Sequence, residues 1–229
     1  MSAEPAFAPT LFRFLRDLRK NNDRDWFLAH KDVYEGAAKE PALRFVAAFA
    51  APLRRISRQL VADPRPVGGS LFRIHRDVRF AVDKRPYKTH VGIHFRHAAA
   101  DGAHALGLYL HLEPGDVFAS AGIWRPDGAT LSEVREALIA SPAAWRRAVT
   151  GREFEARWAL SGESLLRVPR GYDPDHPLAA DLKRKSYVAH TGFSERDACA
   201  ADFASKLEHA WRASTPFLRF LTRAQGLPW

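Results

Sequence analysis

The chain has 229 residues, which is enough for one large domain or two small ones with a substantial hydrophobic core. Its content of 46% hydrophobic and 11% aromatic residues excludes a disordered chain, and its net charge of +9 favours anionic partners. The single cysteine, Cys199, excludes an intrachain disulfide and a multi-cysteine zinc site.

The N-terminus and the hydropathy pattern argue against export and against a membrane partner. Residues 1–10 contain Glu4 and two prolines, where a signal peptide needs a basic start followed by an apolar run. No stretch approaches about 20 uninterrupted apolar residues, so no membrane span is expected. With the single cysteine, this pattern predicts a cytoplasmic protein.

The first 62 residues are predicted to be helical, because their apolar residues recur at spacings of three and four. Thr10 is the predicted cap of a helix that runs to about Lys20, and Asp23 is the predicted cap of the next. Pro41 suits the first turn of a third helix, which we expect to kink at Pro52.

Period-two patterns then predict β-strands. Residues 71–75 alternate, which would place Arg73 and His75 on the face opposite Phe72 and Ile74. Three further strands, at about 90–96, 105–113 and 117–124, are predicted to form an antiparallel meander, with residues 104–124 as a β-hairpin. The less apolar face of this meander would carry His94, Tyr109 and His111.

The C-terminal half is predicted to mix helices with short strands. Its expected features are a helix capped by Thr130 or Ser132, a helix beginning at Ser141-Pro142, a strand over 154–160, a brief helix from Asp175 and Pro177 to Lys185, a strand over 187–190, and a long helix capped by Ser194 and bent at Pro216. The whole chain, residues 1–229, is therefore predicted to be a single α+β domain. In it an antiparallel sheet is covered by N-terminal and C-terminal helices.

Most of the excess positive charge lies in one segment. Residues 65–96 contain eight Lys or Arg and two acids, which accounts for +6 of the total +9. A local excess of this kind indicates a site rather than a generally basic surface.

Three segments resemble an uncharacterised bacterial and fungal family that is catalogued as domain of unknown function 2461. They are FRFLRDLRKNNDRDWFLAHKDVYE (12–35), GGSLFRIHRDVRFAVDKRPYKTHVGIHFR (68–96) and VPRGYDPDHPLAADLKRKSYVAH (168–190). The resemblance covers about residues 10–223. It implies a single α+β domain and brings no established activity, substrate or cofactor.

Recognition of a phosphate or carboxylate group is the leading hypothesis, because it requires only convergent donors. The residues predicted to line such a basic cleft are Arg73, Arg76, Arg79, Lys84, Tyr87 and Lys88. The alternative is a structural network, in which the arginines pair with nearby acids and the lysines are solvated. The partner expected from the leading hypothesis is a small anionic ligand.

An enzyme is the second hypothesis, namely metal-independent phosphoester hydrolysis or transfer with His75 or His90 as acid or base and Asp77 orienting a histidine. No cofactor and no metal site is expected, because a strongly positive neighbourhood opposes cation binding. His94 and His111 could still meet across strands. A nucleic-acid-binding module, which would use Phe80 and Tyr87 as stacking platforms, is the third hypothesis.

Overall fold

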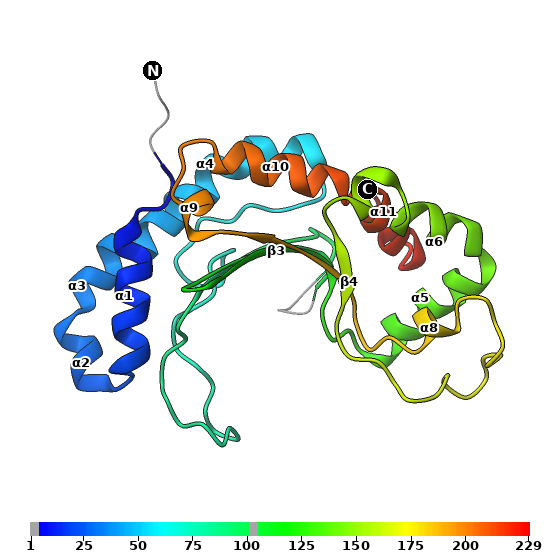
Figure 1. Ribbon diagram of the computed structural model, residues 1–229, viewed down its shortest axis with the longest axis horizontal. Helices are drawn as coiled ribbons and strands as arrows, with labels where there is room; N and C mark the ends of the chain where they lie inside the picture. The colour runs from blue at the N-terminus through cyan, green and yellow to red at the C-terminus, as the bar shows by residue number, and fades with distance from the viewer. Residues whose placement is uncertain (1–4, 101–104) are drawn as a thin grey trace.

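The computed structural model describes residues 5–100 and 105–229, and a five-stranded antiparallel sheet lies at its centre (Figure 1). The strands occur in the order β1-β2-β3-β5-β4, with the bounds β1 Val91–Arg96, β2 Gly107–Glu113, β3 Asp116–Ile123, β4 Ala159–Ser161 and β5 Tyr187–Phe193. The predicted meander of β1, β2 and β3 is confirmed. The first residue of the predicted hairpin, residue 104, lies outside the described residues.

Helices precede the sheet, lie between its strands and follow it. They are α1 Pro9–Lys20, α2 Arg24–Ala29, α3 Lys31–Tyr34, the π-helical segment η1 Glu35–Lys39, α4 Glu40–Ile56, α5 Gly128–Ala140, α6 Pro142–Val149, α7 Arg152–Glu155, α8 Ala179–Leu182, α9 Glu195–Ala198, α10 Phe203–Ala213 and α11 Thr215–Ala224. In the described part of the chain, none of them is both long enough and apolar enough to cross a membrane.

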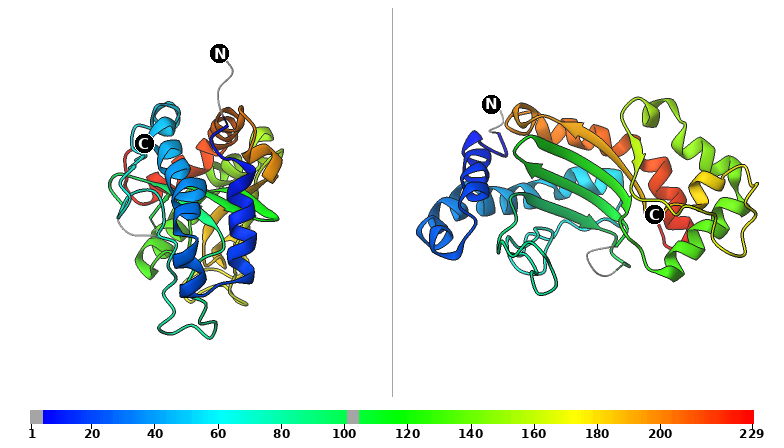
Figure 2. Two further views of the ribbon diagram at one scale, coloured as in Figure 1. Left: turned by 90° about the vertical axis from the view of Figure 1, so that its left-hand side faces the viewer. Right: turned by 60° about the horizontal axis from the view of Figure 1, so that its bottom comes forward.

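The helices leave the two faces of the sheet in different environments. α4 and α10 lie across the convex face, and Figure 2 shows the concave face free of them (Figures 1 and 2). Phe49 of α4 stacks on Phe95 of β1 at 5.5 Å between ring centroids, and Trp211 of α10 contacts both rings. The α+β fold, with helices from both ends of the chain on one face, is thus as predicted.

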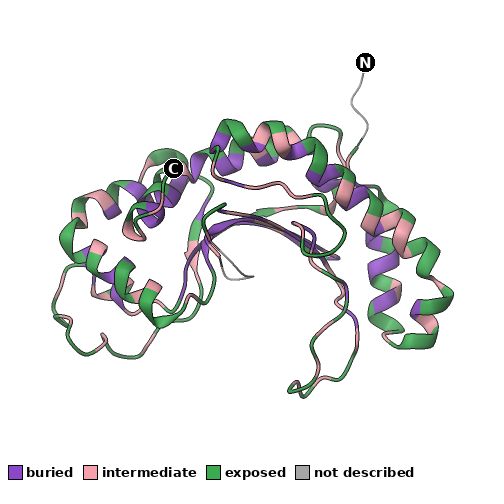
Figure 3. Ribbon diagram, turned by 180° about the vertical axis from the view of Figure 1, so that it is seen from behind, coloured by how far each residue is buried: buried purple, intermediate pink, exposed green. Residues whose placement is uncertain are grey.

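Strand alternation explains this division. Ile93 pairs with Leu110, which in turn pairs with Ala119, and all three are fully buried on the helix-covered side. Figure 3 shows the buried residues concentrated in the strands and on the helix sides that face them. The alternate residues therefore face the concave side and are the ones available for a site.

Residues 71–75 do not form the predicted strand. Leu71 pairs with Ile93 and His75 pairs with Tyr87, each as an isolated bridge. The backbone changes partner midway, because the N–H of Phe72 donates to β1 at Gly92, whereas the next bonds run to the returning segment 86–88. Ile74 is buried in the core, whereas Phe72 is half-buried.

Two other predicted elements are also wrong. Of the predicted strand over 154–160, only residues 159 and 160 belong to a strand, β4. Phe154 lies in the helix α7 and Trp158 just after the turn that follows it, and both side chains are buried in the core. The single long C-terminal helix is three helices. Ser194 caps only α9, and the predicted bend at Pro216 lies at the first turn of α11.

The predicted helix starts are partly confirmed. The Asp23 carboxylate accepts a hydrogen bond from the Trp26 N–H at 2.9 Å, and Pro41 occupies the first turn of α4, as expected. The first helix instead begins after Ala8, with no side-chain cap. Asp127, rather than Thr130 or Ser132, caps α5, because its carboxylate accepts from the Thr130 N–H.

Candidate functional site

Residues 76–86 of the basic segment form a loop that projects from the sheet (Figure 1). The three arginines of this loop bind acids of the same loop. Arg76 and Arg85 both contact Asp83 at 2.7 Å, and Arg79 contacts Asp77 at 2.7 Å. Hydrogen bonding by Arg79 lowers the pKa of Asp77 to about 2, and hydrogen bonding by Arg85 lowers the pKa of Asp83. This is the charge network that the sequence left open as the alternative to an anion site.

The other predicted residues of this segment are also placed within or against it. The Lys84 ammonium donates to the Val78 carbonyl at 3.1 Å. Tyr87 is buried and stacks on Phe27 at 4.1 Å between centroids, and the exposed His75 lies beside it. Tyr87 is thus a core residue and not a stacking platform.

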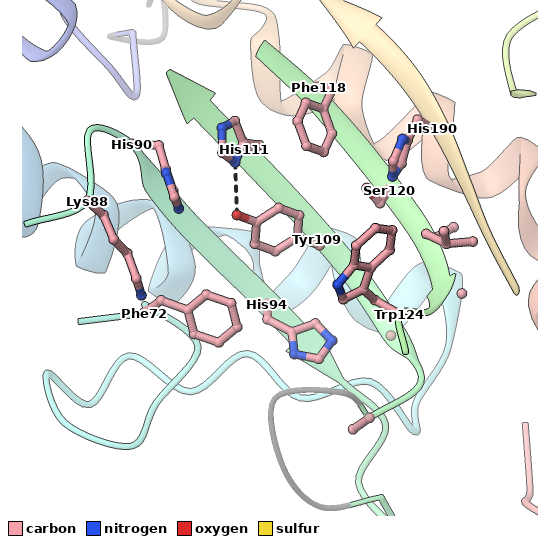
Figure 4. A pocket seen from close by; sticks show the side chains of 15 residues that line it. Phe72, Lys88, His90, His94, Tyr109, His111, Phe118, Ser120, Trp124 and His190 are labelled. Carbon is pink, nitrogen blue, oxygen red and sulfur yellow. Dashed lines mark hydrogen bonds between the residues drawn. The ribbon is translucent and has the colours of Figure 1, made fainter. Parts of the chain in front are cut away.

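A pocket of about 540 Å³ lies on the concave face of the sheet (Figure 4). Its described lining consists of Phe72, Lys88, His90, His94, Ala105, Gly107, Tyr109, His111, Phe118, Ser120, Ala121, Gly122, Trp124, Val188 and His190. Among the predicted site residues, Lys88 and His90 belong to this lining, whereas the three arginines, Lys84, Tyr87, His75 and Asp77 do not. The structure therefore divides the predicted set between a loop and a pocket.

A hydrogen-bonded chain of three side chains runs along β2 on the pocket face. The Tyr109 hydroxyl lies 2.9 Å from Nδ1 of His111 (Figure 4). Nε2 of His111 lies 3.1 Å from Oε2 of Glu113. Because an ionised carboxylate only accepts, His111 donates from Nε2 to Glu113, and Nδ1 is left to accept from the phenol. The alternation of β2 places all three residues on one face.

Glu113 is fixed by groups from two other elements. Its Oε1 accepts from Nη2 of Arg19, on α1, at 2.7 Å and from the hydroxyl of Thr89 at 2.6 Å. Burial acts to raise the pKa of Glu113, but the hydrogen bonds from Thr89, His111 and Arg19 outweigh it, so this pKa is lowered. Burial, with Glu113 adding to it, raises the pKa of Tyr109, so its phenol stays protonated.

Three further ionisable side chains of the pocket, those of His90, His190 and Lys88, have lowered pKa values. The ring of His90 lies 4.3 Å from that of His111, and burial, followed by His111, lowers the pKa of His90 to about 4. Burial also lowers the pKa of His190, whose Nδ1 lies 3.1 Å from the Ser161 hydroxyl. At the pocket edge, burial and then Arg73 lower the pKa of Lys88.

Gly92 of β1 makes room for this arrangement. A Cβ atom at Gly92 would lie 2.7 Å from the hydroxyl of Tyr109 and 3.2 Å from the ring of Phe72. The absence of a side chain at this position therefore lets the Tyr109 ring lie over β1 and reach His111.

Sequence reasoning placed Tyr109 and His111 on the correct face but did not include Glu113, Phe118 or His190 in the site. The alternation of β2 contained the signal for Glu113, which belongs to the same set as His111. Arg19 is 94 positions from Glu113, and no local pattern connects residues that far apart.

The fold and the pocket define an α+β protein with a histidine-rich and aromatic pocket on the uncovered face of an antiparallel sheet. The chain belongs to the family described as Conserved hypothetical protein (DUF2461), whose model matches residues 10–220. The resemblance noted in the sequence is thereby confirmed. Comparisons with curated proteins and with solved structures gave no match.

Proposed function

We propose that this protein binds a small organic molecule that carries a phosphate or carboxylate group, and that it does so in the concave pocket with Lys88 as the anion partner. The observation that carries the proposal is the composition of the pocket wall. Lys88 is the only Lys, Arg, Asp or Glu among the described lining residues, and the rest of the wall is mainly histidine, aromatic and small residues. Such a wall with few charged groups is typical of small-molecule sites.

The geometry of Lys88 supports the role of anion partner. Its Nζ donates to the Arg73 carbonyl at 2.9 Å and lies 5.3 Å from the centroid of the Phe72 ring. The carbonyl uses one of the three N–H groups of the ammonium. The contact with Arg73 fixes the charge at the pocket edge, where it can donate to an anion as well.

The aromatic residues support a planar group on the ligand. Phe72, Phe118 and Trp124 lie around the pocket, with Tyr109 between them (Figure 4). Aromatic rings bury large areas of a planar ligand and favour offset or edge contacts with it. An aromatic phosphate or carboxylate would therefore match both the aromatic wall of the pocket and the charge of Lys88.

The arginines contribute less to this proposal than the sequence predicted. Arg76 and Arg79 bind Asp83 and Asp77, so a ligand would have to compete with those carboxylates. The proposed ligand site is accordingly the pocket and not the loop. The cytoplasmic location stays a prediction from the sequence.

Phosphoester hydrolysis or transfer is the second candidate, and the position of His90 favours it. His90 lines the pocket together with Lys88, so a base and an anion partner would face the same ligand. His75 lies outside the described lining and does not share this arrangement. A nucleic-acid-binding module has less support, because Tyr87 is buried and Phe80, which is 96% exposed, is left as the only predicted platform.

A binding panel with two matched lysine variants tests the proposal. Phenyl phosphate, benzoate, inorganic phosphate and short single-stranded DNA are compared at constant ionic strength by thermal shift and calorimetry. A ligand that binds the folded chain raises its unfolding temperature. We expect phenyl phosphate or benzoate to bind the wild type, to bind Lys88→Met at least about tenfold more weakly, and to bind Lys84→Met unchanged, since an ionic hydrogen bond contributes about 1.5 to 3 kcal/mol.

The reverse result would contradict the proposal. If Lys84→Met loses binding and Lys88→Met keeps it, the loop is the site. Preferential binding of the DNA, with a steep loss as salt rises, would favour the nucleic-acid module. Release of phosphate from phenyl phosphate that is abolished in His90→Ala would establish the enzyme candidate.

A further inference from the structure

His90, His111 and Glu113 bring three metal-binding side chains together at one end of the pocket. One ligand atom from each, a ring nitrogen from each histidine and a carboxylate oxygen from Glu113, lies within 4.8 Å of the other two. The histidines are adjacent in Figure 4, with their rings 4.3 Å apart. This cluster goes beyond the proposed function, because neither the binding of an anion at Lys88 nor phosphoester chemistry requires it.

The fold brings His90 to two residues of β2, His111 and Glu113. Val91 pairs with Leu112 in the β1–β2 register, so the preceding residue, His90, comes beside Glu113 at the end of the strand pair. His111 and Glu113 are two positions apart on β2 and therefore share a face. The sequence did not predict a metal site, because it lacks a carboxylate cluster and the register that joins these residues cannot be read from spacing.

We propose that His90, His111 and Glu113 bind a divalent transition-metal ion of the zinc type. Two imidazole nitrogens and one carboxylate oxygen are a donor set that such ions take in proteins, with a fourth position left for water or a ligand. Tetrahedral bonds of about 2.0 to 2.1 Å would hold the donor atoms roughly 3.3 Å apart. His111 and Glu113 already have a separation of 3.1 Å, so His90 is the residue that moves.

The groups around the three side chains are arranged as an outer shell. Arg19 and Thr89 both donate to Oε1 of Glu113, which leaves Oε2 directed at His111. The Tyr109 hydroxyl lies at Nδ1 of His111 and can accept from it when Nε2 binds an ion, since a hydroxyl both donates and accepts. Outer partners of this kind orient the ligands of metal sites.

Some charged groups near the cluster oppose the binding of a metal ion, and others favour it. Arg19 binds Glu113 and Lys88 lies close to His90, and both cations oppose the binding of a metal ion. Glu113 attracts the ion, as does the carboxylate of Asp116, whose charge acts on Tyr109. Removal of the charge of Lys88 is therefore expected to leave metal affinity unchanged or higher, although it abolishes the proposed anion contact.

Metal titration of the full chain tests the cluster directly. The purified protein is stripped with a chelator, dialysed and titrated with Zn²⁺ and with Co²⁺, without any organic ligand. We expect a single ion per chain, a visible Co²⁺ spectrum of tetrahedral intensity, and no comparable binding of Mg²⁺, which prefers oxygen ligands. His90→Ala and Glu113→Gln should each weaken Zn²⁺ at least about tenfold, and Tyr109→Phe should weaken it by a smaller factor.

His94→Ala is the matched control, because His94 lines the same pocket but does not belong to the cluster. It should bind Zn²⁺ as the wild type does. His90 is half-buried and directly precedes β1, so its variant is the one on which the test depends if Glu113→Gln does not fold. The proposal is overturned if the wild type takes up no ion, or if His90→Ala and His94→Ala bind Zn²⁺ equally well.

Lys88→Met separates this inference from the proposed ligand site. This variant should no longer bind phenyl phosphate or benzoate but should still bind Zn²⁺. A chain that binds the organic anion but no metal would overturn the metal site alone, and a chain that binds metal but no organic anion would overturn the proposed function alone.

Discussion

The loop of residues 76–86 and the concave pocket show how differently the same residue types are used in one chain. The loop contains six charged residues among its eleven, yet its arginines bind Asp77 and Asp83 and its side chains are largely exposed. The pocket has a single Lys in its described lining, and His111 connects Tyr109 to Glu113, which in turn binds Arg19. Our proposal therefore places the ligand site by how the charges are paired and not by how densely they occur in the sequence.

The largest effect on stability is expected from a substitution of Gly92, which lies beneath the Tyr109 ring. Gly92→Ala would place a Cβ atom 2.7 Å from the Tyr109 hydroxyl, which His111 holds in place. Overpacking of this kind lowers the free energy of unfolding by about 1 to 3 kcal/mol. Urea unfolding measures the loss. The control is Gly36→Ala, because a Cβ atom at Gly36 meets nothing within 4 Å; it should be neutral or stabilising, and an equal loss in both variants would contradict the account of Gly92.

A smaller effect is expected from the hydrogen-bonded chain. Tyr109→Phe removes the partner of Nδ1 of His111, which is a buried side chain, and should lower the free energy of unfolding by about 1 kcal/mol. A double-mutant cycle with His111→Ala isolates this contact. Tyr109→Phe should cost less in the His111→Ala background than in the wild type, and equal costs would mean that the two residues are not coupled.

A substitution in the loop should change stability and ligand affinity very little. Arg79→Ala removes an ion pair with Asp77 in which the side chains are 77% and 47% exposed. Exposed pairs of this kind contribute little, because water screens both charges. We expect no measurable change in the urea midpoint or in the affinity for phenyl phosphate. A loss of ligand affinity in Arg79→Ala would assign the loop a role in binding and break the comparison between the two regions.

The smallest effect concerns pH. The pKa of Asp77 is about 2 in the folded chain, below its ordinary value of 3.8, so the ionised form is favoured by folding. This contribution to stability is present above the unfolded pKa and is lost as the pH falls through the folded pKa. Between pH 4 and about 2 the wild type should therefore lose slightly more stability than Asp77→Asn. Urea midpoints over this range measure the difference, and an equal loss in the two proteins would mean that Arg79 does not hold the Asp77 carboxylate.

The secondary structure could be predicted from the sequence where the local hydrophobic pattern agrees with the packing in the folded chain. The alternating leucines at 106, 108, 110 and 112 predicted β2, and their alternation reflects one face buried under α4 and α10. Residues 154–160 were misassigned because strand-forming residues occur there although most of the segment is helix and turn. Phe154 packs against Phe217 of α11, and Trp158 donates to the Ala210 carbonyl of α10. Packing against α10 and α11 decided the outcome, and it is not visible locally.

The residues of the candidate site could be predicted only in part, because their proximity also depends on packing. The motif that contains Lys88 and His90 stood out by its composition, and both residues line the pocket. The partners that define their environment come from α1, β2 and β5, and their proximity depends on strand register and on helix packing. Arg19 and Glu113 illustrate this. Nothing in the sequence near either residue indicates that they pair, yet in the folded chain Nη2 of Arg19 lies 2.7 Å from Oε1 of Glu113.

The most direct test of the central claim, that the pocket and not the loop is the ligand site, is an amide NMR titration of the wild-type chain with phenyl phosphate. The account predicts that the signals that move belong to the pocket strands, including Gly92, His94 and Tyr109, and that the amides of Arg79 and Phe80 stay in place. If the loop amides move and the pocket amides do not, the basic loop is the binding site and the account is contradicted.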